Sequence, residues 1–293
     1  MSLPKLALAV IGDEIGPTLD EMISFCAENH VTRLDMRTLE GRNIMGMTVD
    51  EAARTSARLE SAGIIVPTFV SPLLKWAPPG KTSSAGKVDF AFDPADCPSE
   101  DPFAHAFDLA VALGASRIRI FSYLRYDGYD PLDLLDITDR VMDLSGRWGI
   151  TAELENEPVC NIGTIPEMAA FFASFEQPGE GIDKPALRPL IDISNSYSMG
   201  APPTDADIAV LAPLCDQIHL KDRKLAERRT VPVGDGDVPW PAELRRLLSG
   251  VDAKTKEVLA SIETHCPDDR RNATARSVAG IRRIAAEIGV EVI

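Results

Sequence analysis

Thr151-Ala-Glu-Leu-Glu-Asn-Glu-Pro158 is the stretch of the chain that says most about the fold. It follows a helix-like run and a glycine, so we predict a β-strand here. Because the side chains of a strand alternate between its two faces, Glu153, Glu155 and Glu157 fall on one face. Carboxylates inside a large protein each need a partner, a proton, water or a metal ion. The rest of the chain must supply groups that meet this strand.

Short apolar segments alternate along the whole chain with amphipathic, helix-like segments. We predict strands at residues 6–11, 31–36, 64–70, 116–123, from 151 onward, 186–193, 217–221 and 258–264. We predict helices at residues 18–30, 48–62, 102–113, 131–148, 165–175, 205–214, 240–248 and 273–288. This alternation over 293 residues predicts an α/β fold, a (β/α)8 TIM barrel that forms a single domain over residues 1–293. The alternative is a doubly wound open sheet, but the turn at Gly12–Gly16 lacks the G-x-G-x-x-G spacing typical of that fold.

The irregular segment at about residues 71–100 interrupts the alternation after the third strand. It is rich in proline and glycine, and structureless loops of this length inside a compact domain are often lids over a functional site. A linker between two domains is the alternative. We predict a lid, because the alternation of strands and helices resumes after it with the same rhythm.

The overall composition narrows the classes of partner. The chain is 45% hydrophobic, enough for a large core, and its formal net charge is −15. That charge repels phosphate backbones and anionic membrane surfaces, so we expect a small-molecule partner and neither nucleic acid nor a membrane. The five cysteines are scattered and form no C-x-x-C pair, which is typical of free thiols in a reducing compartment. Without a signal-peptide pattern or a membrane-length apolar run, we expect a cytoplasmic protein.

Polar side chains gather at the predicted ends of four successive strands, where barrels carry their functional groups. They are Glu155 and Glu157 after the fifth strand, Asp192 and Asn195 after the sixth, His219 and Lys221 at the seventh, and Glu263 and His265 at the eighth. Two glutamates, one aspartate and one histidine make an oxygen-rich set with one nitrogen. Such a set suits one divalent ion, Mn²⁺, Mg²⁺, Co²⁺ or Zn²⁺.

Three of the four ligand candidates also have a simpler structural explanation. Glu155 could pair with Arg119 on the adjacent strand, Asp192 could cap a helix, and His219 could be a hydrogen-bonded core histidine. Glu153 lies deeper, and we expect it to pair with an arginine. All four ligand-type residues fall at corresponding strand ends, however, and this coincidence favours a metal site.

At these positions the chain resembles the xylose-isomerase-like TIM-barrel superfamily, the sugar isomerase/epimerase group, over nearly its whole length. The resemblance rests on the order and spacing of five segments, namely Leu154-Glu155-Asn156, Leu190-Ile191-Asp192, Ile218-His219-Leu220-Lys221-Asp222, Val233-Gly234-Asp235-Gly236-Asp237-Val238 and Ser261-Ile262-Glu263. Members of this group typically bind one divalent metal ion through a Glu, an Asp, a His and a second Glu. The resemblance therefore implies the metal ligands Glu155, Asp192, His219 and Glu263.

The resemblance further implies an enzyme of carbohydrate metabolism, an isomerase or epimerase that acts on a sugar, a keto-sugar or a polyol-derived carbonyl compound. The metal ion would polarise a carbonyl group, Glu155 and Glu263 would move a proton as catalytic acid–base groups, and the cation would hold the enediolate. The candidate substrate-binding residues are Asn195, Lys221, Arg223, Glu157 and His265, with Trp76 or Phe90 of the predicted lid as an apolar wall.

Two positions depart from the superfamily pattern, because Asn195 and Glu157 stand where many members have histidine. An asparagine can form hydrogen bonds but cannot gain a proton, so the substrate or the reaction could differ. A lyase of the keto-polyol dehydratase type and a non-catalytic ligand-binding barrel remain alternatives. Metal-dependent endonucleases share the superfamily, but they need more histidines than the four present here and a basic face. A homo-oligomer is compatible with the fold.

Overall fold

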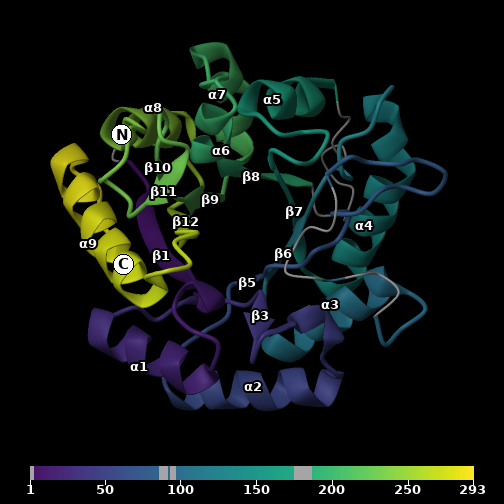
Figure 1. The fold of residues 1–293 in the computed structure, drawn as a ribbon, viewed down its shortest axis with the longest axis horizontal. Coiled ribbons are helices and arrows are strands. Elements are labelled where there is room, and N and C mark those ends of the chain that lie inside the picture. Colours follow the sequence, from purple (N-terminus) through teal and green to yellow (C-terminus); the bar gives the residue numbers. More distant parts are fainter. Residues whose placement is uncertain (1–2, 86–91, 93–96, 175–186) are drawn as a thin grey trace.

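A computed structural model describes residues 3–85, 92, 97–174 and 187–293 of the chain. Eight parallel strands form one sheet that curves into a nearly closed barrel, and helices surround it (Figure 1). The predicted single-domain TIM barrel is confirmed. No helix among the described residues is long and apolar enough to cross a membrane.

The barrel strands are β1 (Lys5–Ile11), β2 (Leu34–Asp35), β5 (Thr68–Phe69), β6 (Arg117–Ile120), β7 (Thr151–Glu155), β8 (Arg188–Asp192), β9 (Gln217–Leu220) and β12 (Glu257–Ile262). Their order in the sheet is β2-β1-β12-β9-β8-β7-β6-β5. Parallel bridges between Arg33 and Ile65 and between Met36 and Phe69 link the two edge strands. Single bridges replace a continuous ladder here, which explains why β2 and β5 are shorter than predicted.

In the described part of the chain, two hairpins lie outside the barrel sheet. β3 (Thr38–Leu39) pairs with β4 (Arg42–Asn43), and β10 (Asp222–Lys224) pairs with β11 (Arg229–Val231). The second hairpin directly follows β9, so the chain remains extended beyond the barrel strand at this point.

The helices are α1 (Leu19–Asn29), α2 (Val49–Ser61), α3 (Pro102–Leu113), α4 (Leu135–Trp148), α5 (Ile165–Ser174), α6 (Ile193–Ser198), α7 (Asp205–Leu211), α8 (Trp240–Gly250) and α9 (Arg270–Ile288). Short 3-10 turns lie at Gly12–Glu14, Ile44–Gly46, Pro131–Leu134 and Ala212–Leu214. Capping boxes begin α1 at Thr18 and α2 at Thr48, because each threonine and the glutamate three residues later satisfy each other's backbone N–H groups. The short helix α6 was not predicted from the sequence.

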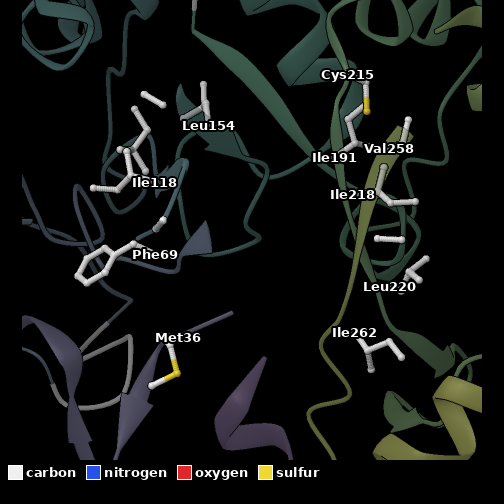
Figure 2. Close-up of a cluster of buried hydrophobic side chains, with 14 of the residues drawn as sticks. Met36, Phe69, Ile118, Leu154, Ile191, Cys215, Ile218, Leu220, Val258 and Ile262 are labelled. Carbon is white, nitrogen blue, oxygen red and sulfur yellow. The ribbon is translucent and has the colours of Figure 1, made fainter. Parts of the chain in front are cut away.

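The apolar core lies between the sheet and the helices. Ile118, Leu154, Ile191, Ile218 and Ile262 of successive strands point outward into this layer (Figure 2). Strand side chains alternate, so the residues between them point into the barrel. This alternation sends the polar residues of β7, β8, β9 and β12 inward, toward the carboxyl end of the barrel.

Candidate metal and active site

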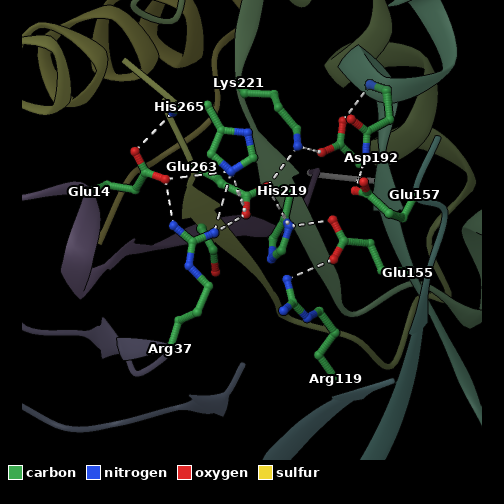
Figure 3. Close-up of polar contacts among 12 residues, drawn as sticks. Glu14, Arg37, Arg119, Glu155, Glu157, Asp192, His219, Lys221, Glu263 and His265 are labelled. Atoms are coloured by element: carbon green, nitrogen blue, oxygen red, sulfur yellow. Dashed lines mark hydrogen bonds and ion pairs between the residues drawn. The ribbon is translucent and has the colours of Figure 1, made fainter. Parts of the chain in front are cut away.

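Glu155, Asp192, His219 and Glu263 come together at the carboxyl end of the barrel (Figure 3). Each offers one ligand atom, and these four atoms all lie within 4.8 Å of one another. All four residues are buried. Glu155, Asp192 and His219 lie on the neighbouring strands β7, β8 and β9, and Glu263 directly follows β12, in the positions that the sequence predicts.

Local hydrogen bonds fix the ends of β7 and β8 relative to each other. Asn156 donates its side-chain amide to the carbonyl of Asp192 at 2.9 Å, and its amide oxygen accepts the backbone N–H of Asp192 at 2.9 Å. The carboxylate of Asp192 also caps α6, since Oδ1 accepts the backbone N–H of Asn195 at 2.7 Å. Asp192 thus caps a helix with one oxygen and keeps Oδ2 directed into the site.

His219 lies between the two glutamates. Its Nδ1 is 2.9 Å from Oε1 of Glu155 and 3.4 Å from Oε2 of Glu263. Burial lowers the pKa of His219, but the nearby glutamates outweigh burial and raise it to about 10. Its Nε2 has no hydrogen-bond partner in the described part of the chain.

Arg119 of β6 holds the outer oxygen of Glu155, with Nη1 3.0 Å from Oε2. The carbonyl oxygen of Ser71 accepts two further hydrogen bonds from this guanidinium, at 3.1 and 3.2 Å. Burial raises the pKa of Glu155, but the charges of His219 and Arg119 outweigh it and lower the pKa to about 2. Glu155 therefore pairs with Arg119, as the structural alternative expected, and at the same time faces His219 with its other oxygen. The ion pair is part of the candidate site.

Lys221 places its ammonium group between two of the candidate ligands. Its Nζ is 2.8 Å from Oδ2 of Asp192 and 2.7 Å from Oε2 of Glu263. Burial raises the pKa of Asp192 to about 6, although the charge of Lys221 opposes the shift. The lysine that the sequence marked as a substrate-binding candidate is thus buried against the candidate metal ligands.

The outer oxygen of Glu263 contacts a second group of charges. Nη1 of Arg37 is 2.5 Å from Oε1 of Glu263, and Nη2 of Arg37 is 2.6 Å from Oε1 of Glu14 and 3.0 Å from Oδ2 of Asp13. Nε2 of His265 is 3.2 Å from Oε1 of Glu263. These residues also line a cavity of about 330 Å³ beside Glu263, which opens to solvent.

The donor set fits a divalent metal ion. Three carboxylates and one imidazole converge, and each glutamate has its outer oxygen held by a buried arginine and its inner oxygen near His219. Hard and borderline divalent ions prefer such oxygen and nitrogen donors. Glu14, Glu263 and His265 form a second close group, but Arg37 already supplies the cation there.

Among the other predicted substrate-binding residues, Asn195 and Glu157 lie beside each other, and Arg223 lines a separate cavity. Asn195 donates its amide to the backbone oxygen of Asn156 at 2.8 Å and lies 3.4 Å from Oε2 of Glu157. Glu157 is also 3.6 Å from Nζ of Lys75. Arg223 lies on β10 and lines a separate cavity, together with Ser198, Leu225 and Arg228.

Trp76 belongs to the predicted lid and packs against two aromatic rings. Its ring centroid is 6.4 Å from that of Phe92 and 6.2 Å from that of Phe103 on α3. Phe90, the other predicted wall residue, lies outside the described residues. Whether the segment covers the site therefore stays a prediction.

Sequence reasoning did not select Arg37 and Glu14 as site residues. Arg37 follows Asp35 by two positions at the end of the second strand, so the alternation that marked His219 and Lys221 could have marked it. Glu14 had no such signal, because it lies in a 3-10 turn beyond β1. Glu153 pairs with Arg117 at 3.3 Å, as the sequence interpretation expected.

The Gly-Asp-Gly segment after β11 wraps around one carboxylate. Asp222 accepts the backbone N–H groups of Gly234 and Gly236 through Oδ2, at 2.9 and 3.0 Å, and that of Val238 through Oδ1 at 3.2 Å. A Cβ atom on Gly236 would lie 1.9 Å from Oδ1 of Asp222, so only glycine fits. This buried aspartate therefore fixes the loop that follows the hairpin.

Three solved structures with this fold cover nearly the whole chain. The zinc-bound IolI protein is 13% identical, with a TM-score of 0.68 over 97% of this chain and 98% of its own. The 3-keto-D-glucoside 4-epimerase YcjR from E. coli is 11% identical, with a TM-score of 0.67 over 95% of this chain and 100% of its own. The probable 3-DHS dehydratase AsbF from Bacillus anthracis is 14% identical, with a TM-score of 0.66 over 95% of this chain and 98% of its own. At such identities these likenesses show the fold alone.

No curated protein matches the sequence at a significant level. The sequence model of one family does match, over residues 35–287, and that family is described as the xylose isomerase-like TIM barrel. The matched range includes the four candidate ligands and most of the barrel. The chain therefore belongs to the xylose isomerase-like TIM barrel family.

Proposed function

We propose that this chain is a divalent-metal-dependent isomerase or epimerase that acts on a sugar, a keto-sugar or a polyol-derived carbonyl compound. The observation that carries the proposal is the convergence of Glu155, Asp192, His219 and Glu263 within 4.8 Å at the carboxyl end of the barrel. The proposed cofactor is one divalent ion, Mn²⁺, Mg²⁺, Co²⁺ or Zn²⁺. The zinc bound by the IolI protein supports a metal at this kind of barrel.

A bound divalent ion would polarise a substrate carbonyl and acidify the neighbouring C–H bond. Glu155 at the end of β7 and Glu263 directly after β12 both approach His219 on β9, with one oxygen each near Nδ1. One of these glutamates would accept the proton, and the other, in its protonated form, would donate its own proton to the opposite face of the carbon. If the first glutamate instead returned its proton to the neighbouring carbon, the substrate would isomerise. Arg119 and Arg37 hold the outer oxygens, which keeps both carboxylates oriented for this exchange.

The groups around the two glutamates would bind the hydroxyl groups of a small-molecule substrate. Lys221 and His265 contact Glu263, and Asn195 lies beside Glu157 at the end of β7. Arg223, which is farther along the chain after β9, would bind a more distant part of the substrate. The cytoplasmic location and the homo-oligomer remain predictions from the sequence.

A dehydratase of the same fold is the second candidate. The observation that favours it is the ammonium group of Lys221, 2.7 Å from Glu263, because a proton donor beside a catalytic base could protonate a leaving hydroxyl group. The dehydratase activity in the name of the similar AsbF protein supports this candidate.

The test combines metal content with exchange of substrate protons. We expect the purified protein to hold one divalent ion per chain, and Glu155→Gln and Glu263→Gln to bind it more weakly. A panel of keto-sugars and polyol-derived ketones in deuterated buffer would reveal the acidified carbon by deuterium uptake. Loss of water from the product identifies the dehydratase. A wild-type protein that binds no divalent metal at micromolar concentrations contradicts the proposal.

A further inference from the structure

Several buried atoms inside the barrel lack a hydrogen-bond partner in the described part of the chain, and two of them belong to residues that lie near Ser261. These two are Nε2 of His219 and Oδ2 of Asp35, and both residues are fully buried. Buried polar atoms in folded proteins are almost always satisfied, so an orphan atom indicates an ordered water, an ion or a functional role. An N–H donor on His219 and a carboxylate acceptor on Asp35, both without a partner inside the same barrel, suggest that one molecule binds to both.

Asp35, the last residue of β2, belongs to a polar layer inside the barrel. Its Oδ1 accepts the backbone N–H of Thr68 at 3.1 Å, and Oγ1 of Thr68 donates to Oε1 of Gln217 at 2.9 Å. The side-chain amide of Gln217 then donates to Oγ of Ser261 at 3.1 Å. Barrel interiors are usually filled with branched apolar side chains. Four polar residues from β2, β5, β9 and β12 are a departure that requires a cause.

This polar layer lies next to His219. Gln217 precedes His219 by two residues on β9, so both side chains point into the barrel, and Ser261 of β12 is paired in register with His219. Burial raises the pKa of Asp35 to about 6, and the Ser261 hydroxyl and the charge of His219 oppose this shift. Nδ1 of His219 faces Glu155, so Nε2, on the other side of the ring, is turned away from the carboxylates.

We propose that Asp35 is a positioning residue for His219 and acts through a buried water. This water accepts the Nε2–H of His219, donates to the carboxylate of Asp35 and also contacts Ser261. A histidine that binds a metal commonly donates its second ring N–H to a carboxylate, a carbonyl or a water, and this fixes the tautomer and the ring orientation. A buried water needs two to four polar partners, and His219, Asp35 and Ser261 supply three. Nδ1 is then free to serve as the ligand. The inference rests on the proposed metal-dependent function.

The test measures the dissociation constant of Zn²⁺ for the full chain by calorimetry, after removal of bound metal. Asp35→Asn keeps the size of the side chain and an oxygen for the Thr68 N–H but removes the carboxylate. We expect its Zn²⁺ affinity to fall by about 10- to 100-fold, as for other partners of metal-binding histidines. Ser261→Ala removes one contact of the water, and we expect a smaller loss.

Glu153→Gln is the matched control. Glu153 is another fully buried carboxylate of the barrel, with both oxygens unpartnered by hydrogen bonds in the described residues, but it pairs with Arg117 at 3.3 Å. We expect this substitution to change the thermal midpoint and to leave Zn²⁺ affinity unchanged. In nitrogen-15 NMR spectra of the zinc-loaded protein, the Nε2 proton of His219 should exchange slowly in wild type and faster in Asp35→Asn.

The outcomes separate the two proposals. Wild-type Zn²⁺ affinity in both Asp35→Asn and Ser261→Ala would overturn the positioning role and leave the proposed function intact. A wild-type chain that binds no divalent metal would remove the proposed function and this inference with it. If Asp35→Asn does not fold, Ser261→Ala and the exchange of the His219 proton decide the matter.

Discussion

The ammonium group of Lys221 lies 2.7 Å from Oε2 of Glu263, and both side chains are only 3% exposed. The same nitrogen is 2.8 Å from Oδ2 of Asp192. A buried cation shared by two carboxylates compensates the desolvation of all three groups, so the removal of one member is costly. A divalent ion that binds to these carboxylates would have to share them with this lysine.

Lys221→Met should destabilise the metal-free protein by about 3–5 kcal/mol, because it leaves two buried carboxylates without their shared cation. A divalent ion should then stabilise the variant more than the wild type, since it replaces the missing charge and meets no competing ammonium group. Thermal midpoints with and without Mn²⁺ measure both effects. Lys75→Met, which removes a lysine 3.6 Å from Glu157, is the matched control. Equal metal-induced shifts in wild type and Lys221→Met would contradict the expectation.

Arg119→Met should destabilise the protein by about 3–5 kcal/mol, because Glu155 loses the guanidinium that holds Oε2 at 3.0 Å. Glu155→Gln in the Arg119→Met background should recover part of this loss, since a neutral amide needs no cation. Urea unfolding of both single variants and the double variant measures the coupling between the two residues. Additive losses would mean that the contact contributes nothing specific.

The stability of the metal-free protein should fall as pH rises between about 6.5 and 10. Burial lowers the pKa of His219, but the glutamates outweigh burial and raise it to about 10 from its ordinary value of 6.5. The folded state thus holds a proton that the unfolded state releases, so the contribution is complete below pH 6.5 and lost by pH 10. At about 1.4 kcal/mol per pKa unit, the loss is at most about 5 kcal/mol. Urea titrations with a chelator measure it, and His219→Gln should flatten the slope.

Gly236→Ala should destabilise the protein by about 1–3 kcal/mol, because the new Cβ would overlap the Asp222 carboxylate at 1.9 Å. Gly46→Ala is the control, since its nearest neighbour is the flexible side chain of Arg42 at 3.3 Å. Differential scanning calorimetry of the two variants gives the comparison. If both variants unfold at the same temperature, the Gly-Asp-Gly loop can move away from Asp222 at little cost in free energy.

Local patterns in the sequence were sufficient to predict the barrel and to select the four candidate ligands. The period of two along a strand is a local property, and it placed His219 and Lys221 on the inner face of β9 without knowledge of their partners. The edge strands were predicted too long, because only isolated bridges such as Met36–Phe69 join them. The helix α6 was missed, since its six residues show too little periodicity and its cap is the Asp192 carboxylate itself.

By itself, the sequence determined the order of the strands along the chain, the faces of their side chains and the convergence of Glu155, Asp192, His219 and Glu263. Only the tertiary structure decided which charges neutralise them. Arg37 contacts Glu263 across 226 residues of sequence, and no local pattern reports such a pair. Among the three glutamates that follow Thr151, Glu153 pairs with Arg117, Glu155 faces His219, and Glu157 lies beyond the last strand residue near Asn195. The three glutamates have different contacts because the register of the strands, and not the type of residue, determines which groups lie opposite each carboxylate.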